Sequence, residues 1–185
     1  MLTITLLGLP QIYLGDRELV VSRRKSRALI YFLACQDQPV LRQQLLSIFW
    51  ADLPRPAAQQ TLRTTLHGLR RALGDWISAH EDWVGLSEQV WVDARQFERQ
   101  MSEALSDSAA LEQALALYRG EFLEGFSLAA AQPFEDWLTV TRDHYRRLAI
   151  RGWSTLASLL EAHGDYRRAL ETLERALAIN PLQED

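Results

Sequence analysis

The chain has 185 residues, 48% of them hydrophobic, and a formal net charge of −4. These values allow one large domain or two small ones with real cores. The apolar runs are too short and too often interrupted by charge to cross a membrane, and Met1–Thr5 lacks the features of a signal peptide. Because Cys35 is the single cysteine, no intramolecular disulfide can form, and we expect a cytoplasmic protein.

The charge is divided unevenly along the chain. Residues 23–71 hold nine basic side chains and two acidic ones, whereas residues 93–185 hold ten basic and sixteen acidic ones. Such asymmetry indicates a half that faces nucleic acid, joined to an acidic half.

Three short strands and a helix are predicted first. Apolar and polar residues alternate over residues 2–6, and strands at Gln11–Leu14 and Arg17–Val21 follow. Ser22 has the side chain of an N-cap for a helix spanning Arg23–Cys35.

Two more helices and a hairpin come next. After a short strand at Val40, the pattern predicts helices at Leu41–Trp50, with Trp50 in the core, and at Ala57–Leu73, where Gly74 provides a C-cap. We expect Trp83–Leu86 and Val90–Val92 to pair as a hairpin. Strands, three helices and a final hairpin predict a winged helix, whose second and third helices dock on DNA.

The helix at Ala57–Leu73 has two different faces. Its apolar stripe consists of Leu62, Leu66, Leu69 and Leu73. The opposite face consists of Gln60, Arg63, Thr64, His67, Arg70 and Arg71. Such side chains can pair with base edges or hold phosphates in a DNA groove, although a solvated basic face is the alternative.

From residue 93 onward the pattern is helical. We predict helices at Phe97–Leu105, Ala109–Arg119, Pro133–His163 and Asp165–Ile179. The spacing from Gly164-Asp165-Tyr166 to Asn180-Pro181 is that of a tetratricopeptide repeat. The core of the repeats is predicted to include the aromatic residues Trp137, Tyr145, Trp153 and Tyr166. Because residues 182–185 start another element, we expect the repeat domain to be truncated and the protein to be longer.

Motifs over most of the chain resemble one family in the right order. They are Leu6-Leu7-Gly8, Arg23-Arg24-Lys25-Ser26-Arg27-Ala28-Leu29, Leu45–Trp50 with Asp52, Leu62-Arg63, Leu69-Arg70-Arg71-Ala72-Leu73-Gly74, Val92-Asp93 with Phe97, Tyr118-Arg119-Gly120-Glu121-Phe122-Leu123, and Glu135-Asp136-Trp137-Leu138 with Arg142. The chain is thereby similar to the bacterial transcriptional activator family, whose best-known members regulate antibiotic synthesis in streptomycetes. The resemblance implies an α+β winged-helix domain of the OmpR type at residues 1–92. An all-α, tetratricopeptide-like activator domain at residues 93–185 would follow.

The resemblance also implies binding to direct DNA repeats near promoters and contact with RNA polymerase or its sigma factor. Base contacts are predicted at Gln60, Arg63, Thr64 and His67. Phosphate contacts are predicted at Arg23, Arg24, Lys25, Arg27, Arg42, Arg70 and Arg71. Two features depart from an ideal reader of DNA, namely Gly68 within the helix and an acidic wing flanked by Glu81 and Asp82, with Glu88 at its tip.

Other functions are less compatible with these residues. The four histidines lack ligand spacing, Cys35 has no histidine nearby, and no glycine loop could cradle phosphate, so we expect no catalysis, cofactor or metal. The alternative is a protein-interaction scaffold in which the winged helix and the repeats both bind protein. The acidic residues Glu121, Glu124, Glu135 and Asp136 would form either a partner surface or a solvated face. Monomers on tandem repeats and a homodimer are both compatible with the sequence.

Overall fold

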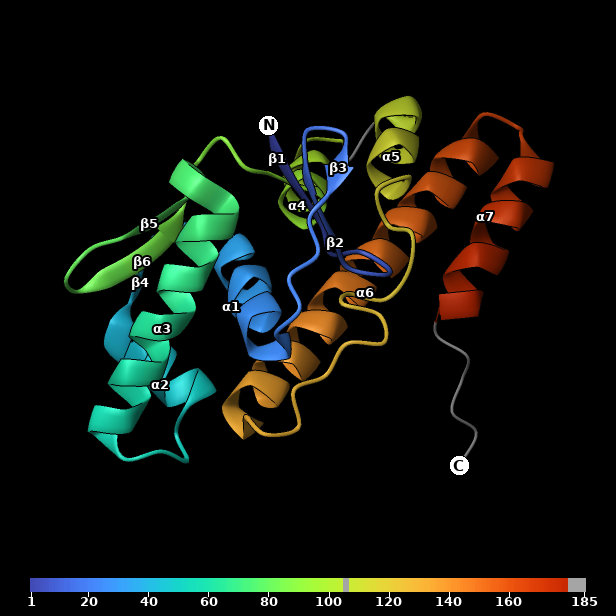
Figure 1. Ribbon diagram of the computed structural model, residues 1–185. Coiled ribbons are helices and arrows are strands. Elements are labelled where there is room, and N and C mark those ends of the chain that lie inside the picture. Colours follow the sequence, from blue (N-terminus) through green and yellow to red (C-terminus); the bar gives the residue numbers. More distant parts are fainter. Residues whose placement is uncertain (105–106, 180–185) are drawn as a thin grey trace.

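Four short strands form the first sheet of the computed structural model, which describes residues 1–104 and 107–179 (Figure 1). Its order is β3 (Arg17–Glu18), β2 (Gln11–Leu14), β1 (Leu2–Thr5) and β7 (Trp91–Val92). Strand β1 is antiparallel to β2 and parallel to β7. The third strand ends earlier than predicted because the chain turns away from the sheet, leaving Val20 82% exposed.

Three helices follow, at the predicted places. They are α1 (Arg24–Ala34), α2 (Arg42–Phe49) and α3 (Arg55–Leu73). The predicted cap at Ser22 is wrong, because the first helical bond of α1 runs from the Arg27 N–H to the Arg23 carbonyl and the N-cap is Arg23. Gly74 ends α3 with a φ of +58°, a conformation that favours glycine.

The wing differs from the predicted hairpin. The second sheet has the order β4 (Val40–Leu41), β6 (Trp83–Leu86) and β5 (Ile77–Ala79), so the hairpin joins β5 to β6. The predicted partner of β6, around Val92, instead pairs with Ile4 in the first sheet. Val92 is fully buried in this non-local pairing, and burial of its apolar side chain favours it. Glu81 and Asp82 therefore lie in the turn of the wing, whereas Glu88 lies outside it.

The second half of the chain is helical. It contains α4 (Asp93–Glu103), α5 (Ser108–Leu115), α6 (Gln132–Ala162) and α7 (Tyr166–Ile179). Helix α5 ends before the predicted Arg119, because the chain leaves the helix to bury Tyr118 and Phe122. The predicted helix end at Leu105, the Asn180-Pro181 stop and the element over residues 182–185 lie outside the described residues. No helix within residues 1–104 and 107–179 is long and apolar enough to span a membrane.

The aromatic core of the repeats is predicted correctly except at one position. Tyr145 and Trp153 are buried and Trp137 is half-buried, but Tyr166 is 69% exposed. Tyr166 lies on a face of α7 that no other part of the described chain covers. The same face exposes Leu170, Leu173 and Leu177.

The two halves share one continuous hydrophobic core. Trp50 is buried in this core, as predicted. The Phe32 ring of α1 contacts the Trp137 ring of α6, with centroids 5.0 Å apart, and Tyr31 contacts Phe126 at 5.3 Å. Helix α1 is consequently buried on nearly all sides from Ala28 to Ala34. The winged helix is therefore fixed against the helical half by apolar contact.

A buried carboxylate also joins the two halves. Asp93, fully buried at the start of α4, accepts hydrogen bonds from the Leu6 N–H at 2.7 Å and the Leu7 N–H at 3.1 Å. Arg119 pairs with the same carboxylate at 3.0 Å. Burial raises the pKa of Asp93 above its ordinary value, and these donors oppose that shift.

Candidate nucleic-acid interface

Helix α3 has an apolar face in the core and a polar face in solvent. Its four stripe leucines, Leu62, Leu66, Leu69 and Leu73, are 2–3% exposed. All the side chains predicted to contact bases are exposed on the other face, namely Gln60, Arg63, Thr64 and His67. Arg70 and Arg71 lie on the same exposed face. The helix thus presents hydrogen-bonding side chains to solvent along one face.

The hydrogen bonds of this face leave most of its donors available. The Thr64 hydroxyl donates to the Gln60 carbonyl at 3.0 Å and keeps its lone pairs for other donors. Arg70 donates to the Ala79 carbonyl of β5 and so connects α3 to the wing. Within the described chain, Arg63 and His67 have no hydrogen-bond or ion-pair partner. At Gly68 an added Cβ would meet no atom within 4 Å, so this part of the face is open.

Unlike the exposed arginine at the centre of the α3 face, most of the basic residues at the start of α1 contact other parts of the protein. Arg24 donates to the Ser127 carbonyl at 2.5 Å and to its hydroxyl at 3.2 Å, so it also connects the winged helix to the helical half. Arg24 and Arg27 lie over the Phe126 ring, and Lys25 lies over the Trp50 ring at 5.5 Å. Arg23 is exposed and lines a surface pocket of about 350 Å³. The other residues of that pocket include Val20, Thr64, His67 and Gly68.

A second pocket, of about 370 Å³, lies between α2, α3 and the wing. We call it the arginine pocket, because it is lined by Arg42, Arg55 and Arg63. Its acidic residues are Glu81 and Asp82 of the wing turn. The predicted helix began at Ala57, so Arg55 was outside it and had no predicted role. Proline in the first turn of a helix is common, and this signal could have placed Arg55 in α3.

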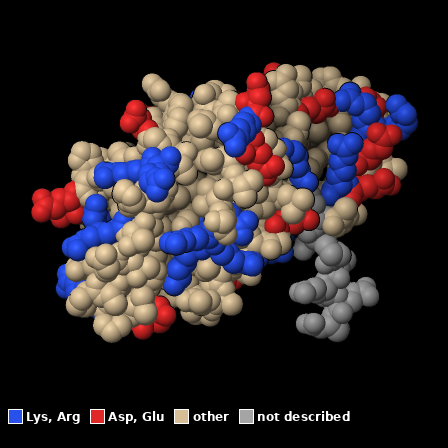
Figure 2. All heavy atoms as spheres, in the orientation of Figure 1, with Lys and Arg blue, Asp and Glu red and all other residues tan. Residues whose placement is uncertain are grey.

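The charged surface reflects these placements. Figure 2 shows lysine and arginine side chains gathered over α3 and the start of α1, and acidic side chains at the end of the β5–β6 hairpin. At the end of the molecule that carries α7, both signs are mixed. The basic surface and the polar face of α3 therefore belong to one side of the winged helix.

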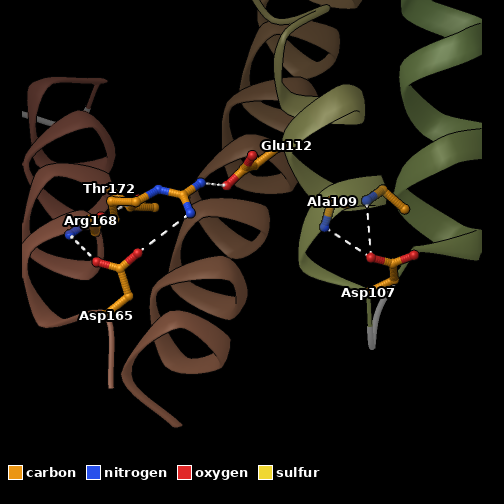
Figure 3. Close-up of polar contacts among 7 residues, drawn as sticks. Asp107, Ala109, Glu112, Asp165, Arg168 and Thr172 are labelled. Carbon is orange, nitrogen blue, oxygen red and sulfur yellow. Dashed lines mark hydrogen bonds and ion pairs between the residues drawn. The ribbon is translucent and has the colours of Figure 1, made fainter. Parts of the chain in front are cut away.

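The helical half uses its charges for internal pairing. Arg168 of α7 contacts Glu112 of α5 and lies 3.5 Å from Asp165, as Figure 3 shows. The Asp107 carboxylate caps α5 by accepting from the Ala109 N–H at 2.9 Å. Arg142 of α6 donates to three backbone carbonyls, those of Phe122, Leu123 and Phe126. These contacts fix helices and loops to each other.

Within residues 1–104 and 107–179, the reactive side chains lie apart from one another, except for one pair of a histidine and a glutamate. Burial raises the pKa of the Cys35 thiol, which keeps it protonated and a poor nucleophile. The His144 ring lies 2.6 Å from the Glu98 carboxylate, an exposed pair between α6 and α4. In the described part of the chain, no three His, Cys, Asp or Glu side chains gather as metal ligands.

The fold is that of a winged helix followed by tetratricopeptide-like helices, an architecture of transcription regulators. Residues 92–185 match the family model described as the bacterial transcriptional activator domain. The chain therefore belongs to the bacterial transcriptional activator domain family.

One solved structure has the same fold over the whole chain. It is EmbR of Mycobacterium tuberculosis, in complex with a low-affinity phosphopeptide, with a TM-score of 0.67 and 21% identity. The match covers 100% of this chain and 56% of that one, so the chain spans little more than half of the EmbR chain. No curated protein matches the sequence.

Proposed function

We propose that this protein is a sequence-specific DNA-binding transcriptional activator. The observation that supports the proposal best is the polar face of α3, where Gln60, Arg63, Thr64 and His67 are exposed while the leucine stripe holds the helix in the core. Arginine at such a position pairs with guanine, and glutamine pairs with adenine, in the major groove. Membership in the family of transcriptional activator domains supports the regulatory role.

The remaining basic residues would anchor the DNA backbone. Arg71 is exposed on the polar face of α3, Arg23 is exposed beside that face, and Arg42 lines the arginine pocket. Lys25, Arg27 and Arg70 would contribute positive potential while also contacting Trp50, Phe126 and the Ala79 carbonyl, respectively. Arg24 would also contribute positive potential while it donates to the Ser127 carbonyl. Phosphate contacts of this kind determine register and affinity without reading sequence.

The helical half, which begins near residue 93, would make the activator's contacts with other proteins. We propose that it contacts RNA polymerase or its sigma factor when the winged helix occupies direct repeats near a promoter, either as separate monomers or as a homodimer. The role is non-enzymatic and cytoplasmic, and it needs no cofactor. The exposed apolar face of α7 is compatible with a protein partner.

A selection from a randomised duplex library tests the proposal directly. The chain should enrich a repeated motif, and its affinity for that motif should fall steeply with salt, because phosphate contacts release counterions. Binding to purified RNA polymerase with and without the enriched duplex would test the protein contact separately. No enrichment, together with no binding even at low salt, would overturn the DNA-binding function and favour the protein-interaction scaffold.

A further inference from the structure

The arginine pocket gathers three arginines, Arg42, Arg55 and Arg63, and none of them forms an ion pair within the described chain. Arg42 is the first residue of α2 and Arg55 is the first residue of α3. Neither helix has an acidic residue in its first turn or a side chain that caps it. A cation is unfavourable at a helix N-terminus, so both arginines add to a potential that is already positive. The Nε of Arg42 is also buried without a hydrogen-bond partner.

This arrangement suits a phosphate group. Guanidinium groups bind phosphate oxygens through paired hydrogen bonds, and helix N-termini favour anions. Arg63 belongs both to the pocket and to the exposed face of α3, so the pocket adjoins the surface that we propose contacts DNA. A phosphodiester of a bound duplex can therefore reach the pocket.

The wing turn brings two carboxylates to the same pocket. The Arg42 N–H donates to the Asp82 carbonyl at 2.8 Å, which holds the turn beside the start of α2. Glu81 and Asp82 both line the pocket, yet no ion pair joins either of them to Arg42, Arg55 or Arg63 in the described chain. The acids thus reduce the positive potential without occupying the guanidinium groups.

We infer that the arginine pocket binds a DNA phosphate. The carboxylates of Glu81 and Asp82 repel that phosphate and so weaken the binding. The inference rests on the proposed DNA-binding function. It extends that function by assigning Arg55 as a contact and the wing turn as a negative determinant of affinity. Because salt screens this repulsion, the acidic turn should weaken binding most at low ionic strength.

The test compares binding of a mixed-sequence duplex by the wild type, Arg55→Ala and the double variant Glu81→Gln/Asp82→Asn. At about 50 mM salt, the double variant should bind roughly five to ten times more tightly, and Arg55→Ala should bind roughly five times more weakly. The gain from neutralising the acids should shrink in the Arg55→Ala background, because the two changes act on one pocket. Glu88→Gln, an exposed acid outside the pocket, is the matched control and should change little.

The outcomes separate this inference from the function on which it rests. If the wild type binds DNA and the double variant binds it equally well, the inference is overturned and the proposed function stands. If Glu88→Gln increases affinity as much as the double variant, the gain comes from the change in net charge, and the pocket assignment is wrong. If no variant binds at low salt, both proposals fail, whereas binding by the double variant alone would support the inference. Thermal unfolding of each variant verifies that the fold is intact.

Discussion

The two halves of the molecule use their arginines in opposite ways. All eight ion pairs of the described chain take their cation from the helical half, where Arg147 pairs with Asp143 and Arg168 pairs with Glu112. None of the nine basic residues between Arg23 and Arg71 has an acidic partner within the described chain. The helical half thus supplies every cation that pairs with a carboxylate in the described chain, whereas most arginines of the winged helix contact carbonyls, hydroxyls or aromatic rings or remain exposed. Net charge alone, at −4, conceals this difference.

The largest effect should come from the carboxylate that joins the halves. Asp93→Ala would leave the Leu6 and Leu7 N–H groups, which directly follow β1, and the Arg119 guanidinium without their acceptor. We expect it to lower the free energy of unfolding by about 3–5 kcal/mol. Thermal and denaturant unfolding measure this. Glu103→Ala, an exposed acid at the end of the same helix, is the control, and equal losses in both variants would contradict the role given to Asp93.

Arg142 should rank second. Its guanidinium donates hydrogen bonds to the Phe122, Leu123 and Phe126 carbonyls. Arg142→Ala therefore removes the donors that hold a loop packed against the winged helix. A loss of about 2 kcal/mol is expected in denaturant unfolding. Arg147→Ala, an exposed arginine on the same helix, should cost less than about 0.5 kcal/mol. DNA affinity measured well below the melting temperature should be unchanged in both variants, and a loss in either would weaken the contrast between the halves.

Arg63→Ala should affect binding and leave the fold intact. Because Arg63 is exposed and has no partner in the described chain, its removal should not change thermal unfolding. Affinity for an enriched duplex should fall by about tenfold, with relaxed specificity at one or two bases. Selection with the variant and titration of single-base mismatches would measure this. Uniform weakening across all sequences would instead make Arg63 a phosphate contact.

The sequence predicted those parts of the structure that depend on neighbouring residues. The periodicity of Leu62, Leu66, Leu69 and Leu73 was sufficient to place α3 and its exposed face, because helical geometry alone determines them. The prediction of the wing hairpin was wrong because Val92 pairs with Ile4. The pairing of a strand can depend on residues far away in the sequence. The contact of Arg24 with Ser127 spans 103 residues, so no local pattern could indicate that Arg24 also connects the halves.

The smallest expected effect concerns the dependence of binding on salt. Arg71 is exposed at the end of α3 and, if it contacts a phosphate, Arg71→Ala should weaken binding equally for all sequences. The slope of log affinity against log salt should fall by about one, since one counterion fewer is released. Arg151 of α6 is exposed as well but belongs to the helical half, so Arg151→Ala should leave the slope unchanged. If both variants reduced the slope equally, exposure alone would explain the effect. The basic surface of the winged helix would then not be a preferred contact for DNA.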